Sequence, residues 1–278
     1  MAYFKEREII LIGETGLLSR SFKNSFIKQK IPFQVIKISR KNNIKSKEEL
    51  YEILKNYLKN KTSYILINCL ASLKPKNKSD FYINENLPKD LLLYFSEGDS
   101  FLIQFSTNNV LLKKVKDLYT MQKKKAEENI FKIRNSKYKL IRLPLLLPSN
   151  NLNKNYLPKQ FKLLLRFIDL PLISIIPPSR NIYRPINVQE IVDLTISKIT
   201  YNNMNNKNET ININGPKEMN LLEISKLILS EKKNKKKNIF FVIPFPWEIL
   251  DFFLSKFPHL LNLFERSTIL QQFLPIKR

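Results

Sequence analysis

The sequence predicts an α/β fold, a doubly wound parallel sheet, and two observations lead to this prediction. Short, strongly apolar runs recur along the first half of the chain, at 8–12, 33–38, 63–68, 101–106 and 138–147. Segments typical of helices separate them, at about 17–30, 46–60, 80–95 and 117–134. Alternating strands and helices with apolar strands indicate a parallel sheet that helices cover on both faces.

Local signals set the ends of these elements. Pro32 ends the first helical segment, because proline cannot continue a helix. Ser46 and Glu49 form a capping box at the start of the second, whose apolar residues recur with helical spacing. The pattern loosens after residue 148, where a polar loop and several prolines precede helical segments at 189–200, 219–230 and 246–264. We therefore expect two parts: 1–148 with the sheet, and a smaller C-terminal lobe at 149–278 from which the helix at 189–200 returns to the first part.

The composition limits the classes of function. The chain has 48 Lys and Arg against 24 Asp and Glu, a net charge of +24. Because the lysines are spread over the whole chain, we interpret them as a solvated surface rather than a nucleic-acid interface, although the same field would attract an anionic substrate. A single cysteine, Cys69, excludes an internal disulfide, and one cysteine with one histidine excludes a thiolate or imidazole zinc cluster. No apolar run is long enough for a membrane span, and the N-terminal one is too short for a signal peptide, so the cytoplasm is the expected location.

Glycine is rare in this chain, with only four in 278 residues, yet Gly13 and Gly16 stand three residues apart. They lie between the first apolar run and the first helix. A strand, a Gly-x-x-Gly turn and a helix form the geometry of a dinucleotide pyrophosphate site, since glycine lets the phosphate approach and the helix start offers free N–H groups. The stretch therefore predicts a Rossmann-type dinucleotide-binding domain at 1–148. Ser19 takes the third small position of that pattern, a departure that concerns helix–strand packing.

The end of the second strand indicates which dinucleotide binds. An acidic residue there usually holds the 2′-hydroxyl of NAD, whereas a basic residue suits the 2′-phosphate of NADP. This chain has Ser39, Arg40 and Lys41, with no acid. The sequence therefore favours NADP, with NAD as the other possibility.

A second group of residues is typical of proton-transfer chemistry. Thr107 ends a buried strand, and Tyr119 and Lys123 follow as a Tyr-x-x-x-Lys pair on one helix face. An ammonium group beside the phenol is expected to lower its pKa, so that Tyr119 can transfer a proton near neutral pH. A hydroxyl at the neighbouring strand end is able to hold the reacting oxygen.

The order of these motifs resembles the extended, sugar-nucleotide branch of the short-chain dehydrogenase/reductase superfamily, the NAD-dependent epimerase/dehydratase group. The likeness is closest to the 4-dehydrorhamnose reductases. It covers nearly the whole chain in register, through ILIGETGLLS, LINCLA, INENLP, FSTNNV, YTMQKKKAE, IRLPLLLP, YRPINVQEIVD and ININGPKEMNLLEISKLI.

The resemblance implies roles for named residues. It implies a catalytic triad of Thr107, Tyr119 and Lys123, with Tyr119 as the general acid or base, Lys123 on the nicotinamide ribose and Thr107 on the substrate oxygen. The cofactor-binding residues that it and the turn imply are Gly13, Thr15, Gly16, Leu17, Leu18, Ser39, Arg40, Cys69, Leu70, Ala71, Tyr119, Lys123 and Pro144. The implied substrate is a nucleotide-linked sugar, bound by the C-terminal lobe, and the family often forms homodimers through the helices at 80–95 and 117–134.

Two departures leave alternatives open. The segment between Thr107 and Tyr119 is about half the family's length, and the glycine after IRLPLLL is absent. A catalytically idle relative that binds a nucleotide as a scaffold or regulator is therefore the second hypothesis. A third places the aromatic C-terminal helix on a membrane surface, but we favour packing of that helix on the lobe.

Overall fold

The computed structural model describes residues 7–38, 44–58, 63–96, 98–113, 115, 117–134, 136–148, 173–176, 182–200, 208–230 and 241–244. The chain divides into two compact units, the first made of 1–146 and 186–214 and the second of 147–185 and 215–278. Ser39, Arg40 and the C-terminal helix expected at 246–264 lie outside the described residues.

The first unit contains a six-stranded sheet in the order β2-β1-β3-β4-β5-β9, and every neighbouring pair is parallel. Its strands are β1 (Glu8–Ile12), β2 (Phe33–Ile36), β3 (Tyr64–Asn68), β4 (Phe101–Thr107), β5 (Tyr138–Leu143) and β9 (Glu209–Asn212). The predicted doubly wound parallel sheet is thus confirmed. The strand order reverses between β1 and β3, and ligands of such sheets bind beyond the carboxyl ends of the strands at this point.

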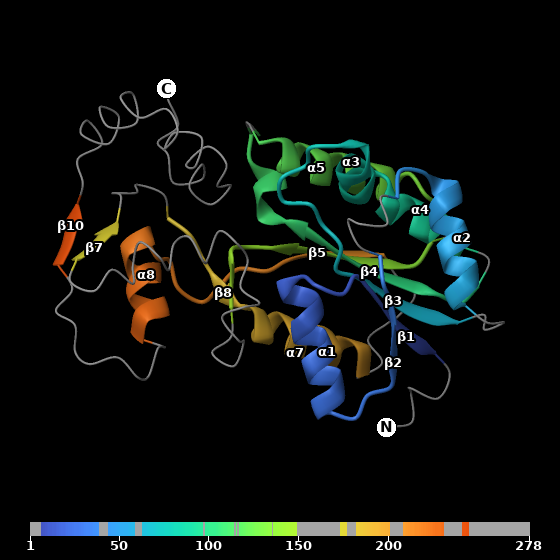
Figure 1. The fold of residues 1–278 in the computed structure, drawn as a ribbon, viewed down its shortest axis with the longest axis horizontal. Helices are drawn as coiled ribbons and strands as arrows, with labels where there is room; N and C mark the ends of the chain where they lie inside the picture. Colours follow the sequence, from blue (N-terminus) through green and yellow to red (C-terminus); the bar gives the residue numbers. More distant parts are fainter. Residues whose placement is uncertain are drawn as a thin grey trace. The chain divides into compact units, whose positions relative to one another are not determined.

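Helices cover both faces of this sheet (Figure 1). One layer pairs α1 (Leu17–Lys28) with α7 (Val188–Thr200). The other layer contains α2 (Lys47–Tyr57), α3 (Lys78–Glu85), α4 (Leu87–Tyr94) and α5 (Leu118–Phe131). A 3₁₀ turn, η2 (Asn108–Leu111), follows β4 on the way to α5. The core between the layers consists of strand residues such as Ile10, Ile12 and Leu66 and helix residues such as Leu50 and Leu91.

Prolines divide two elements that the sequence predicts as continuous. The helix expected at 80–95 is α3 followed by α4, with Pro88 in the first turn of α4, where a missing N–H does no harm. The strand expected at 138–147 ends at Leu143 before Pro144, and β6 (Leu146–Leu147) follows it. A short sheet joins β6 to β8 (Ile186–Asn187).

The described part of the second unit contains a parallel pair of strands and a helix. β7 (Ile173–Ile176) pairs with β10 (Phe241–Pro244), and α8 (Leu221–Ser230) follows an antiparallel bridge between Tyr183 and Met219. No helix in the described part of the chain is both long and apolar enough to cross a membrane.

Candidate active site

The backbone conformation and the packing of the turn between β1 and α1 require glycine at its first position, Gly13. Gly13 has a φ of +97°, which side-chain-bearing residues rarely adopt. A Cβ there would also lie 3.1 Å from the Leu70 side chain. The Gly13 N–H donates to Ile36 O at 3.1 Å, which fixes the turn against the end of β2.

Gly16 differs, because the described protein leaves its position open. It is exposed, its φ of −69° is ordinary, and the nearest atom to an added Cβ is Cys69 O at 3.9 Å. A side chain of ordinary size therefore fits at Gly16 in the protein alone. Packing within the described chain therefore does not require a glycine here, whereas the close approach of a ligand to this backbone would.

Gly16 is the N-cap residue of α1, and it has no side chain with which to accept a hydrogen bond from the first turn. No described side chain caps the backbone N–H groups at this helix start. By contrast Ser46, Asn77 and Asp117 each accept a hydrogen bond from the first turn of α2, α3 or α5. An uncapped helix start offers backbone N–H groups and the positive end of the helix dipole to an anion.

Ser19, the departure at the third small position, has a structural role in this turn. Its side chain is 2% exposed, and its hydroxyl donates to Gly13 O at 2.6 Å. The hydroxyl thus ties α1 to the turn. The serine is compatible with close packing of helix and turn, which a glycine would otherwise provide.

The other residues expected at the cofactor lie at the carboxyl edge of the sheet, apart from Ser39 and Arg40, which are not described. Cys69 N donates to Ile12 O at 3.0 Å, and Leu70 N donates to Asn68 Oδ1 at 3.1 Å. Burial raises the pKa of the Cys69 thiol, which stays protonated. Their exposure varies: Thr15 and Ala71 are exposed, Leu17, Cys69, Leu70 and Pro144 half-buried, and Leu18 buried.

Tyr119 and Lys123 lie one turn apart at the start of α5, and Lys123 connects this helix to β4. The Lys123 side chain is 2% exposed, and its Nζ donates to Phe105 O at 3.1 Å. The same Nζ lies 5.9 Å from the centroid of the Tyr119 ring. Thr107, two residues beyond Phe105, accepts from Asn109 N at 3.3 Å, which leaves the hydroxyl proton of Thr107 available for another acceptor.

The expectation that Lys123 lowers the pKa of Tyr119 is wrong for this structure. The pKa of Tyr119 is raised, first because its half-buried phenol is desolvated and second because the Asp117 carboxylate, which caps α5, disfavours a phenolate. The Lys123 ammonium is engaged by Phe105 O on β4. Tyr119 is therefore a neutral phenol that holds its proton.

Burial also changes Lys123. It lowers the pKa of the Lys123 ammonium to about 8, while the negative charge of Glu127 acts in the opposite direction. The pKa lies well below the ordinary value of 10.5, so the side chain changes charge in the slightly alkaline range.

A network of buried amides behind Lys123 was not anticipated from the sequence. Asn68 Nδ2 donates to Gln104 Oε1 at 2.7 Å, and Gln104 Nε2 donates to Phe105 O at 2.7 Å. The carbonyl of Phe105 thus accepts from Gln104 and Lys123 together. The signal was present, since Asn68 and Gln104 are polar residues within apolar runs.

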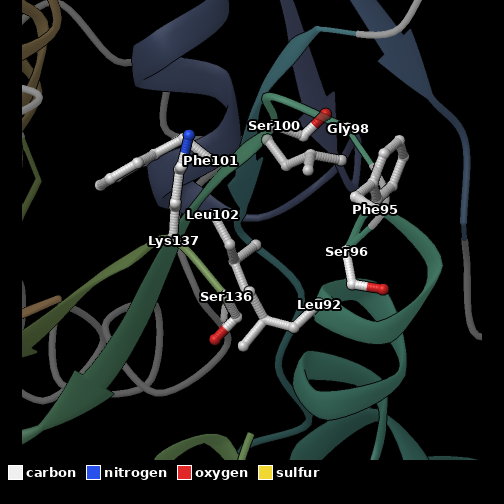
Figure 2. Close-up of a pocket in the computed structure, with 10 residues that line it drawn as sticks. Leu92, Phe95, Ser96, Gly98, Ser100, Phe101, Leu102, Ser136 and Lys137 are labelled. Carbon is white, nitrogen blue, oxygen red and sulfur yellow. The ribbon is translucent and has the colours of Figure 1, made fainter. Parts of the chain in front are cut away.

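A small pocket in the described structure lies elsewhere (Figure 2). Its lining includes Gly98, Ser100 and Phe101, before and at the start of β4, and Ser136 and Lys137, just before β5. This is the amino edge of the sheet, whereas the Gly13–Gly16 turn follows the carboxyl end of β1 and Thr107 is the last residue of β4. The pocket is therefore separate from the candidate active site.

The chain is similar in fold to solved protein structures. No family model matches the chain, and no curated protein matches it in sequence. A dTDP-4-dehydrorhamnose reductase from Bacillus anthracis, solved in complex with NADP, is similar in structure with a TM-score of 0.64 and 14% identity, covering 85% of this chain and 84% of that one.

Two further similar structures have other activities. UDP-glucose 4-epimerase from Thermotoga maritima, solved with UDP-glucose, has a TM-score of 0.61 and 14% identity, and covers 86% of each chain. A dTDP-glucose 4,6-dehydratase from Bacillus anthracis, solved with NAD, has a TM-score of 0.61 and 15% identity, covering 86% of this chain and 85% of that one. These structures are of the class that the sequence motifs resemble, and at these identities they establish the fold.

Proposed function

We propose that this protein is an NAD(P)-dependent reductase or epimerase that acts on a nucleotide-linked sugar. The observation that carries the proposal is Gly16, a glycine that the described fold does not require. It stands at an uncapped helix start, in the turn that follows β1 beside the point where the strand order reverses. This is where a pyrophosphate binds in sheets of this kind.

The described residues fit a nicotinamide dinucleotide. The open backbone at Gly16 accommodates the pyrophosphate, and Cys69, Leu70 and Ala71 border the neighbouring strand end. When bound, the cofactor would supply or accept a hydride. The solved proteins of similar fold were crystallised with NADP, NAD or UDP-glucose, which supports this class of ligand.

We assign the proton chemistry to the group on β4 and α5. In this proposal the neutral phenol of Tyr119 carries the proton that passes to an oxygen that becomes negative as a carbonyl carbon is reduced. The free hydroxyl proton of Thr107 serves to orient the same oxygen. The Lys123 ammonium retains two protons beyond the one given to Phe105 O, and in this proposal they bind the ribose hydroxyls.

NADP is the proposed cofactor, with NAD as the alternative. The proposal depends on Arg40 and on the absence of an acid at 39–41.

Binding measurements test the proposal first. We expect the purified protein to bind NADPH and NADH with measurable dissociation constants, and to prefer NADPH. A panel of nucleotide-linked keto sugars, followed by the cofactor absorbance, then tests turnover. A protein that binds neither dinucleotide contradicts the assignment.

A nucleotide-binding scaffold is the second candidate. The firmly held proton of Tyr119 and the shortened segment before it favour this alternative. It predicts tight dinucleotide binding with no turnover on any sugar of the panel. The two candidates are therefore distinguished by the same pair of measurements.

A further inference from the structure

Glu127 lies one helical turn beyond Lys123 on α5, on the same buried side. Residues four apart on a helix have their β-carbons about 5–6 Å apart and interact directly. As whole residues, Glu127 is 4% exposed and Lys123 is 2% exposed. A carboxylate and an ammonium that are both this deeply buried influence each other strongly, because little water screens them.

Arg142 of β5 fixes the position of Glu127. Its Nη2 donates to Glu127 Oε2 at 2.6 Å, and its Nε lies 3.1 Å from both carboxylate oxygens. Arg142 is held in turn from β9, where its Nη1 donates to Asn212 Oδ1 at 3.3 Å. The carboxylate is therefore held from the sheet, and it cannot turn away to solvent without breaking these bonds.

The other ionisable groups around α5 leave Glu127 as the principal negative charge acting on Lys123. A thiolate at Cys69 would act in the same direction, but the raised pKa of this thiol keeps it protonated and uncharged. Tyr119 is neutral, and β4 and η2 have no ionisable side chain.

The acidic groups on the helices packed against α5 have partners of their own. Asp80 and Glu85 of α3 are engaged by Lys76 N and by Lys125, and Asp90 of α4 accepts from Tyr82. None of these three carboxylates changes the pKa of Lys123.

We propose that Glu127, anchored by Arg142, is a positioning residue that keeps Lys123 in its ammonium form at neutral pH. The inference rests on the proposed function for its purpose, since a charged Lys123 is what would bind the ribose and orient Tyr119. Whatever ligand the site takes, the charge of Lys123 is set through Glu127, which Arg142 of β5 holds in place.

The test measures the titration of Lys123 directly, by NMR of the full chain with lysines labelled at the ε-carbon. The Lys123 signal is identified by its loss in Lys123→Met. In Glu127→Gln the carboxylate is removed while the guanidinium stays, so the Lys123 midpoint moves to lower pH by about one unit or more. Glu128→Gln is the matched control, because Glu128 is exposed on the same helix and its loss leaves the midpoint in place.

Arg142→Met tests the anchor. Without the guanidinium, Glu127 loses the bonds that hold its carboxylate, so it is able to turn away or to take up a proton, and the Lys123 midpoint moves to lower pH by less than in Glu127→Gln. A merely structural pair would loosen the packing and leave the Lys123 midpoint in place. If the Lys123 midpoint in Glu127→Gln does not move to lower pH, the inference is overturned.

Cofactor binding is then measured on the same proteins across the pH range. The proposed function predicts that affinity for NADPH falls as Lys123 loses its proton, and that Glu127→Gln moves this fall to lower pH. A shift of the Lys123 midpoint to lower pH in Glu127→Gln without any dinucleotide binding would uphold the electrostatic role and reject the proposed function. The two failures are thus distinguishable.

Discussion

Replacing Gly16 by valine tests whether the turn after β1 is a phosphate site. The structure predicts that this change spares the fold. The backbone at Gly16 has φ −69° and ψ 158°, which is extended backbone that valine adopts readily. The nearest protein atom to an added Cβ is 3.9 Å away, an ordinary contact.

The expected magnitudes differ for stability and for binding. Valine is a poorer helix cap than glycine by about 1 kcal/mol, but removing a glycine stiffens the unfolded chain and returns about 0.4–1 kcal/mol. The net change in the free energy of unfolding is therefore close to zero. A pyrophosphate displaced from the α1 N–H groups loses charge-assisted hydrogen bonds of about 1.5–3 kcal/mol each. The dissociation constant for NADPH should rise by about a hundredfold.

A second variant separates the two effects. Ser46→Ala removes the cap of α2, where Ser46 Oγ accepts from Glu49 N, so it should cost about 1 kcal/mol of stability and leave affinity unchanged. Thermal unfolding and NADPH titration are measured on both proteins. A folded Gly16→Val protein with wild-type affinity refutes the phosphate site, and an unfolded one refutes the open position inferred at Gly16.

Three further changes test the chemistry and the electrostatics. Tyr119→Phe keeps the ring but removes the proton, so turnover on a nucleotide-linked keto sugar should fall about 10²- to 10⁴-fold while cofactor binding persists; activity equal to wild type contradicts the proton role. Because the pKa of Lys123 is about 8 in the fold against an ordinary 10.5, the unfolded chain binds more protons above pH 8. Between pH 8 and pH 9 the free energy of unfolding of the wild type should therefore rise by about 1 kcal/mol more than that of Lys123→Met, as measured by denaturant unfolding. Stability curves that run parallel with pH would contradict this. Arg40→Glu should reverse a preference for NADPH over NADH, because its carboxylate repels a 2′-phosphate and accepts from a 2′-hydroxyl; equal preference in both proteins would show that Arg40 does not read the cofactor.

The sheet was predictable because its signals are local. Strands β1 and β3 each contain four consecutive apolar or aromatic residues, and Ser46 with Glu49 fixes the start of α2 within a few residues. Ser46 does accept from Glu49 N, although the Glu49 carboxylate accepts from Lys45 N instead of Ser46 N. The divisions at Pro88 and Pro144 depend on how the surrounding chain packs.

The electrostatics of the site could not be predicted from spacing. A Tyr-x-x-x-Lys pair indicates that two side chains share a helix face, but not what else surrounds them. Here Phe105 O engages Lys123, and Asp117 caps the helix close to Tyr119. The contact with Phe105 depends on the packing of α5 on β4, and desolvation followed by the Asp117 charge raises the pKa of Tyr119 where a lower pKa was expected.

The buried charges of α5 and β5 bear on whether the protein is a catalyst. Taking an ion out of water costs several kcal/mol, and apolar replacements of buried ion pairs are often neutral or stabilising. Stability alone therefore does not explain why Lys123, Glu127 and Arg142 lie together beneath the surface of this unit. A requirement for an ammonium group at position 123 does explain it, because a lysine buried there without a carboxylate would lose its proton more readily. On this reasoning the Glu127–Arg142 pair belongs to the candidate active site, and its replacement by a glutamine–methionine pair should impair cofactor binding more than folding.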